Sequence, residues 1–280
     1  MPDATAEKQK DASKPAVPSA SKADGKAEGD AGSGKMRAWR GCTYDDYRDH
    51  AMRDYPLPAR MALGFVVGGV WLFTNIIWPW RIEDSDKLLG DRREGEPGRM
   101  VVMNHVSMFE PVAMYVYMYT HGLRCRFLYN REFDKIGILS WLLSRAGAIP
   151  VERGTADLKA VRRAERALKR GEYVLVYPEG TRIRTEDQEV TIHGGFALMA
   201  QLGRAPVQPA AVVGARDITP AGTHWKRLFW RVFLKVGDPI TFDELDVKGR
   251  KAKVAAMEKL AMERVYALRD ELRAEHPGKN

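Results

Sequence analysis

The stretch "RMVVMNHVSMFEP", residues 99–111, joins a short apolar run to a polar turn that ends in Glu110 and Pro111. An apolar, β-branched run of this length predicts a buried strand. Proline is favoured in the first turn of a helix, where its missing N–H has no partner to lose. The stretch therefore predicts a strand that leads through a loop into a helix, and a repeat of this unit is typical of an α/β protein.

The rest of the chain repeats this alternation. Strands are predicted at 99–103, 125–129, 147–151, 173–177, 207–213 and 231–237. Helices are predicted at 111–121, 135–145, 155–170, 195–203 and 251–275. In the last of these, apolar residues recur at steps of three or four, which indicates an amphipathic helix at the C-terminus. Together the elements predict an α/β sandwich.

Two regions precede the sandwich. Residues 1–36 contain almost no large apolar side chain, so they cannot bury enough surface to offset their ordering entropy, and we expect a disordered tail. Between Arg60 and Arg81 lie 20 uncharged residues, enough to cross a hydrocarbon core of roughly 30 Å. We therefore predict a membrane-anchoring helical region at 37–98 and a globular domain at 99–280.

The uncharged run has features of more than one kind of anchor. Its tryptophans suit the headgroup region of a bilayer, whereas its glycines, Asn75 and Pro79 argue against one straight spanning helix. A spanning helix, a re-entrant or interfacial anchor and a buried core helix all remain open. More basic residues follow the run than precede it, which places the globular domain on the cytoplasmic side of the cell membrane.

Charge and cysteine content limit the partners. Lys and Arg total 45 against 37 for Asp and Glu, and the net charge of +8 favours anionic partners such as phosphates or an acidic lipid surface. No basic and aromatic motif of a nucleic-acid binder occurs, so no nucleic acid is expected as a partner. Two cysteines are too few for a disulfide framework or a cysteine metal site.

His105 and Glu110 stand five positions apart, and on one continuous helix they would point about 140° away from each other. At a loop-to-helix junction, however, Glu110 can fold back toward the imidazole. A histidine can take a proton from a hydroxyl, and a carboxylate on its other nitrogen stabilises the imidazolium. Ser107 lacks the flanking glycines of a nucleophile elbow, so the pair would activate a hydroxyl of a substrate; a structural role is the alternative.

The stretch "YPEGTR", residues 177–182, follows a strongly apolar strand. Gly180 permits unusual backbone angles, exposed amides at such a turn can hold an oxyanion, and the fork of Arg182 suits a phosphate. Arg153, in "GAIPVERG" at 147–154, also follows an apolar strand. Taken singly, either arginine is equally well explained as a solvent-facing surface residue.

In this order along the chain, "NHVSMFEP", "GAIPVERG", "YPEGTR" and "VQPAAV" (207–212) resemble the four sequence blocks of the glycerolipid acyltransferases of the 1-acylglycerol-3-phosphate acyltransferase type. The resemblance covers residues 100–237 and implies a sandwich with a central mixed sheet flanked by helices. It implies that His105 is the base and Glu110 its acid partner. It also implies a phosphate-binding Arg153 and contacts to the acceptor from Glu179, Gly180, Thr181 and Arg182.

The activity implied by the resemblance is transfer of a fatty acyl group from acyl-CoA or acyl carrier protein to the free hydroxyl of 1-acyl-sn-glycerol-3-phosphate. No metal and no resident cofactor are expected. One position departs from the family pattern, which has Asp where this chain has Glu110, one methylene longer. An acyltransferase for glycerol-3-phosphate, another lysophospholipid or an amino-acid lipid is therefore an alternative, and so is a non-catalytic lipid-binding relative.

Overall fold

The computed structural model describes residues 42–90, 95–152, 154, 157–185, 187–219 and 226–279. The predicted tail, 1–36, lies outside them. The described residues belong to one compact unit, so the predicted boundary at residue 98 stays a prediction.

The strands are β1 (Trp80–Glu83), β2 (Met100–Met103), β3 (Cys125–Asn130), β4 (Ile149–Val151), β5 (Tyr173–Val176), β6 (Val207–Val213) and β7 (Val232–Val236). The helices are α1 (Tyr44–Asp49), α2 (Leu57–Ile77), α3 (Asp86–Leu89), α4 (Phe109–Thr120), α5 (Gly137–Arg145), α6 (Leu158–Lys169), α7 (Gly195–Gly203) and α8 (Arg250–Glu275).

The seven described strands form one mixed sheet in the order β1-β7-β6-β2-β5-β3-β4. Neighbouring strands are parallel except β6 and β7, which are antiparallel. Every residue of β2, β5 and β6 is buried, as expected for strands covered on both faces. The predicted mixed sheet flanked by helices is confirmed.

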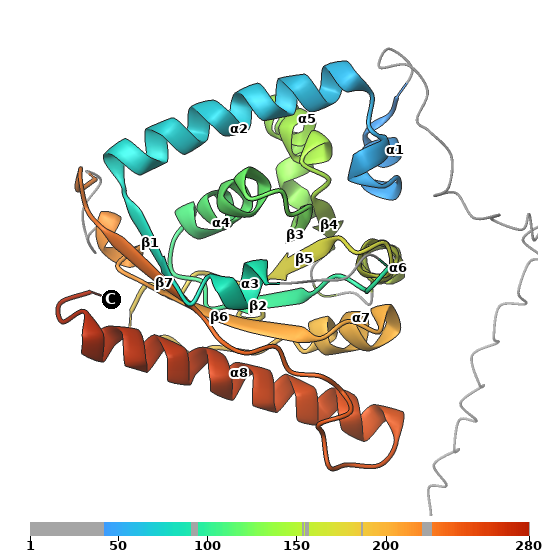
Figure 1. Cartoon of the computed structure of the whole chain (residues 1–280), viewed down its shortest axis with the longest axis vertical. Coiled ribbons are helices and arrows are strands. Elements are labelled where there is room, and N and C mark those ends of the chain that lie inside the picture. The colour runs from blue at the N-terminus through green and yellow to red at the C-terminus, as the bar shows by residue number, and fades with distance from the viewer. Residues whose placement is uncertain are drawn as a thin grey trace, which may run out of the picture. The chain divides into compact units, whose positions relative to one another are not determined.

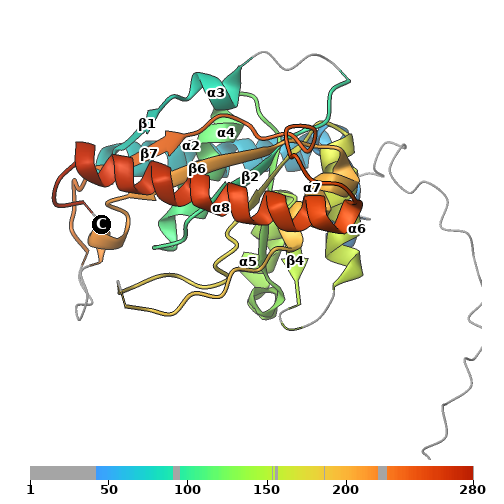
Figure 2. The same cartoon turned by 90° about the horizontal axis from the view of Figure 1, so that it is seen from below.

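Helices cover both faces of this sheet. On one face α4 packs against the sheet and α2 lies over α4 (Figure 1). On the other face α8 lies across β6, β7 and β2, next to α7 (Figure 2). Each side has its own apolar core, one containing Met114 of α4 and the other Met257 of α8. The carboxyl ends of β2 and β5 lie at the same edge of the sheet, and the polar turns that contain His105 and Gly180 follow them there.

The structure differs from the sequence predictions at the start of α4 and by one additional strand. Helix α4 begins at Phe109, not at Pro111, so Glu110 lies in the first helical turn and not in the loop. Pro111 is still within the first turn, where its missing N–H costs no helical hydrogen bond. The short strand β1 was not predicted, because its Trp80 ends the uncharged run and its residues are only partly buried.

Helix α2 occupies most of the uncharged run and ends two residues before Pro79. Among the described residues it is the one helix long and apolar enough to cross a membrane by length and composition. Its buried residues, Ala59, Leu63, Val67 and Thr74, form an inner stripe that faces the protein. Its other faces expose large apolar side chains, including Met61, Phe65 and Leu72. The helix therefore packs on the body along one side only.

The segment around α1 is fastened to the sheet by a buried ion pair. Arg126 of β3 is fully buried, and its Nε donates to Oε2 of Glu172 at 2.6 Å. Its Nη1 donates to the carbonyl of Arg48 at 2.8 Å, and the amide of Met52 donates to Glu172 at 2.7 Å. Removing one partner of a buried ion pair typically costs about 3–5 kcal/mol. Residues 48–52 are therefore an integral part of the folded body.

Candidate active site

His105 lies in the loop between β2 and α4, at the carboxyl end of a central strand, as predicted. Its Nδ1 lies 3.5 Å from Oε2 of Glu110, and the Glu110 side chain is fully buried. This distance is longer than a good hydrogen bond, and Nδ1 is a buried atom with no hydrogen-bond partner among the described residues. The ring also packs against that of Tyr177, with 4.5 Å between centroids and the planes tilted by 36°. The structure thus brings the predicted pair together.

Glu110 also organises the loop itself. The amide of Val106 donates to its Oε1 at 2.5 Å, and the amide of Ser107 donates to both carboxylate oxygens at 2.7 and 2.9 Å. The carboxylate lies in the first turn of α4, where the helix dipole favours negative charge. One buried carboxylate therefore fixes the backbone beside His105 and faces the imidazole.

The backbone of His105 is held from the other side by the turn after β5. Its N–H donates to Oε2 of Glu179 at 2.6 Å, and its carbonyl accepts from the amide of Ile183 at 2.7 Å. Oε1 of Glu179 accepts from the hydroxyl of Tyr266 at 3.1 Å. Burial raises the pKa of Glu179 to about 7, although these two donors and the charges of His105 and Arg269 oppose the rise. Glu179, predicted to contact the acceptor, thus holds the His105 loop.

Gly180 has a structural reason to be glycine. Its φ of +61° lies in the left-handed region, and a Cβ here would come within 2.6 Å of the ring of His193. Its amide donates to the carbonyl of Tyr177 at 3.0 Å, which closes the turn. The amide of Gly180, one of those predicted to hold an oxyanion, is therefore already engaged by the turn itself.

The remaining predicted site residues are Thr181, Arg182 and Arg153. Thr181 is exposed and Arg182 is half-buried, and both follow Gly180 at the same edge of the sheet as His105. The carbonyl of Arg182 accepts from Nε2 of Gln188, which braces the loop after the turn. Arg153 lies outside the described residues, so its predicted proximity to phosphate stays a prediction.

Sequence reasoning missed Tyr177 and Tyr266. The sequence predicts Tyr177 only as the last residue of a strand, whereas in the structure its ring packs against that of His105. Tyr266 lies on the C-terminal helix, 161 positions after His105, and reaches the site through Glu179. The position of Tyr177 directly before the predicted turn is a signal that could have placed it near His105. No local sequence pattern indicates that Tyr266 lies near the active site.

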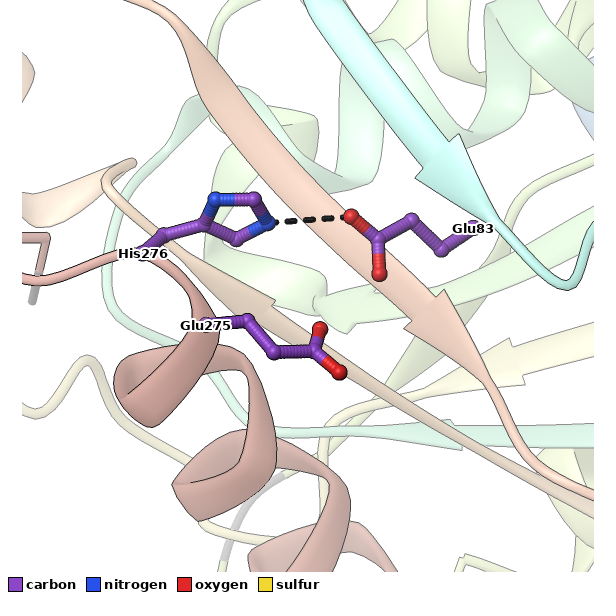
Figure 3. Close-up of side chains that lie close together, drawn as sticks. All are labelled: Glu83, Glu275 and His276. Carbon is purple, nitrogen blue, oxygen red and sulfur yellow. Dashed lines mark hydrogen bonds and ion pairs between the residues drawn. The ribbon is translucent and has the colours of Figure 1, made fainter.

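Among the described residues one group of His and acidic side chains is close enough to hold a metal ion: Glu83, Glu275 and His276 (Figure 3). Nε2 of His276 lies 2.9 Å from Glu83, as the dashed line in Figure 3 shows. Nζ of Lys235, however, lies 3.0 Å from Glu275 and 3.9 Å from Glu83, so an ammonium already neutralises these carboxylates. We therefore interpret the group as an ion-pair network that joins β1, β7 and the end of α8, and not as a metal site.

Comparison with known proteins agrees with this arrangement. The Acyltransferase family matches residues 88–213, which include His105, Glu110 and the "YPEGTR" turn. The chain is 24% identical over 179 residues to the 1-acyl-sn-glycerol-3-phosphate acyltransferase of Bacillus subtilis, covering 63% of this chain and 84% of that one. It is 33% identical over 95 residues to the lyso-ornithine lipid O-acyltransferase of Pseudomonas aeruginosa, covering 34% of this chain and 36% of that one.

A solved structure shares the fold. The crystal structure of the 1-acyl-sn-glycerophosphate acyltransferase PlsC from Thermotoga maritima superposes with a TM-score of 0.53 at 22% sequence identity. The superposition covers 75% of this chain and 80% of that chain. The family match spans the four sequence blocks, and the shared fold places the sheet edge and its polar loops in a common framework. Residues 88–213 therefore form a domain similar to the Acyltransferase family, and the similarity to 1-acyl-sn-glycerol-3-phosphate acyltransferases supports O-acyltransferase activity for this chain.

Proposed function

We propose that the protein transfers a fatty acyl group from an acyl thioester to the free hydroxyl of 1-acyl-sn-glycerol-3-phosphate, giving phosphatidate for phospholipid biosynthesis. The observation that carries the proposal is the His105 loop, where Glu110 faces Nδ1 of the imidazole and Glu179 holds the backbone. With Nδ1 directed at a carboxylate, Nε2 is the nitrogen available to a substrate hydroxyl.

The reaction then needs no nucleophile from the protein. His105 takes the hydroxyl proton, and the acceptor oxygen attacks the thioester carbonyl. A C–O bond forms, the C–S bond breaks, and the departing thiolate receives the proton held by the imidazolium. Glu110 stabilises the positive charge that the ring carries between these two transfers.

An assay with a panel of hydroxyl lipids tests the proposal. Purified protein in detergent should release thiol from acyl-CoA or acyl carrier protein in the presence of lysophosphatidate, and mass detection should find phosphatidate. The similarity to a lyso-ornithine lipid O-acyltransferase makes lyso-ornithine lipid the second acceptor to include. Thiol release with lyso-ornithine lipid alone would reassign the acceptor, and no product with any acceptor would indicate a non-catalytic lipid-binding protein.

We further propose that Arg182 and Arg153 bind the phosphate of the acceptor. Arg182→Ala should raise the KM for lysophosphatidate by about ten- to a hundredfold, because a charge-assisted hydrogen bond contributes about 1.5–3 kcal/mol. The KM for the acyl donor should change little. Arg182→Lys should restore part of the loss, since an ammonium lacks the planar fork of a guanidinium. Arg153→Ala should behave in the same way.

Arg184 offers a matched control, because it is an exposed arginine two positions after Arg182. Arg184→Ala should leave both KM values near those of the wild type. An unchanged acceptor KM in the Arg182 and Arg153 variants would remove both residues from the phosphate site.

We propose that α2 holds the protein on the cytoplasmic side of the cell membrane as an interfacial anchor. Its inner stripe packs on the body, while Phe65 on its outer side is 85% exposed. Replacing Met61, Phe65 and Leu72 together by Gln should move the protein from the membrane to the soluble fraction. Each large apolar side chain contributes roughly 1.5–3 kcal/mol when it leaves water.

A second exposed apolar residue on the opposite layer serves as the control for this experiment. Leu158 of α6 is 65% exposed, and Leu158→Gln should leave the protein in the membrane fraction. Both variants should melt near the wild-type Tm, because none of the changed side chains is buried. A triple variant that stays membrane-bound after a high-salt wash would show that the anchor lies elsewhere.

A further inference from the structure

A pocket of about 330 Å³ lies on the α8 side of the sheet edge, between α8 and the loop that follows the "YPEGTR" turn. Three arginines line it: Arg216 after β6, and Arg269 and Arg273 on α8. Glu179 and Tyr266 form part of the same wall. Arg182 is not among the lining residues, although its neighbour Ile183 is.

The charge of this pocket favours an anion. Glu179 is the one acidic side chain among its described lining residues, and burial raises the pKa of that side chain to about 7, which weakens its opposition to an anion. Arg269 pairs with Asp270, its Nη2 2.8 Å from a carboxylate oxygen, but a guanidinium has further N–H donors for a second anion. Planar guanidinium groups are well suited to phosphate oxygens.

The size of the pocket limits the ligand. A volume of about 330 Å³ lies at the lower end of small-molecule sites. This is room for a phosphate group and a few attached carbon atoms, not for a whole nucleotide-linked thioester. Val106, Val190 and Val212 supply apolar wall for the carbon atoms.

The turns of α8 that carry these arginines are fastened to the sheet by ion pairs. Nζ of Lys235 lies 2.7 Å from Glu271 and 3.0 Å from Glu275, and His276 lies 2.9 Å from Glu83. These ion pairs fasten the last turns of α8 to β7 and β1. A ligand that binds Arg269 and Arg273 therefore loses little free energy to ordering of the helix.

The pocket also adjoins the catalytic loop without containing the imidazole. Asn104 and Val106, the neighbours of His105, line it, and Glu179 joins the amide of His105 to Tyr266 of α8. The imidazole itself lies against Tyr177 and Glu110. A ligand in the pocket thus lies beside the backbone that carries the base.

We propose that this pocket binds a phosphate ester carried by one of the two substrates, with Arg269 and Arg273 as its main contacts. The proposal rests on the proposed function, whose acceptor carries a phosphomonoester and whose donor carries a phosphopantetheine arm. Arg182 is proposed to contact the acceptor phosphate from beside this pocket, where its neighbour Ile183 is a lining residue, so the pocket either adds contacts to that phosphate or holds a phosphate of the donor. The shared chemistry is a phosphate ester, and kinetics can identify its source.

The test uses the full chain with Arg269→Gln and Arg273→Gln combined, and Arg264→Gln as the control on an exposed position of the same helix. The double variant should raise the KM of one substrate at least about tenfold, because each lost charge-assisted contact weakens binding by about that factor. Its kcat should stay within about threefold, since neither arginine touches the imidazole. A rise in the acceptor KM identifies the lysophosphatidate phosphate, and a rise in the donor KM identifies the donor phosphate. Arg264→Gln should change neither.

Direct binding keeps this inference distinct from the proposed function. Calorimetric titration with glycerol 3-phosphate and with CoA should show saturable binding of one probe to the wild type, weakened at least about tenfold in the double variant. Arginine-dependent probe binding without turnover on any acceptor would support the pocket and contradict the proposed function. Unchanged KM values, together with probe binding that is absent or equal in wild type and double variant, would overturn the pocket.

Discussion

Replacing His105 by alanine is expected to abolish nearly all acyl transfer, with kcat falling by at least about 10²- to 10⁴-fold, the usual contribution of a general base. Neither neighbouring carboxylate is free to take its role, because Glu110 accepts the amides of Val106 and Ser107 and Glu179 accepts the amide of His105. Thiol release and product formation should fall together, since one proton transfer serves both.

His121 provides the matched control. It caps the end of α4, and its Nδ1 lies 2.8 Å from the carbonyl of Tyr117, away from the Glu110 carboxylate. His121→Ala should keep kcat within about twofold of the wild type, because surface substitutions usually change stability by less than about 0.5 kcal/mol. Both variants should remain folded by circular dichroism. Substantial phosphatidate formation by the His105 variant would exclude this histidine as the base.

The sequence predicted the framework of the site because its signals are local. The run 99–103, the polar turn and Pro111 lie within 13 residues, and strand-to-helix patterns of this length follow from side-chain periodicity alone. The position of His105 in a loop at the carboxyl end of a buried strand came out as predicted, and so did its proximity to Glu110. What the pattern could not give was the start of α4 at Phe109, because the helix begins without a side-chain cap.

The rest of the site depends on contacts between distant parts of the chain. Tyr266, Arg269 and Arg273 share one face of a helix, and a sequence reading treats such a polar face as solvated. Only the packing of α8 against β6 places them beside Glu179. The role of Glu179 was missed for a related reason, since a carboxylate in an exposed-looking turn gives no local sign that it will be buried against the amide of His105.

Glu110→Gln is expected to lower kcat by about 10² to 10⁴, the range found when a histidine loses its carboxylate partner. A neutral amide cannot stabilise the imidazolium. The structure adds a second cause, because the carboxylate accepts amide hydrogen bonds from Val106 and Ser107 on both oxygens. In Gln one of these oxygens becomes an NH₂ group, so the amide of Ser107 loses one of its two acceptors. The KM values should change less than kcat, since Glu110 is buried and touches no substrate.

Glu110→Asp then separates the two functions of the carboxylate. The existing Glu already stands 3.5 Å from Nδ1, and a side chain shorter by one methylene would have to leave the amides of the loop to come closer. We therefore expect Asp to lower kcat, by less than Gln does, because it keeps its charge. The measurement is the steady-state kcat of the wild type, Glu110→Gln and Glu110→Asp. The Tm of each protein checks that the loop remains folded. If Asp equals or exceeds the wild type, the backbone adapts to either acid and the longer side chain is a tolerated change. If Gln stays within about twofold of the wild type while His105→Ala is inactive, His105 works without this carboxylate, and Glu110 serves the loop amides alone.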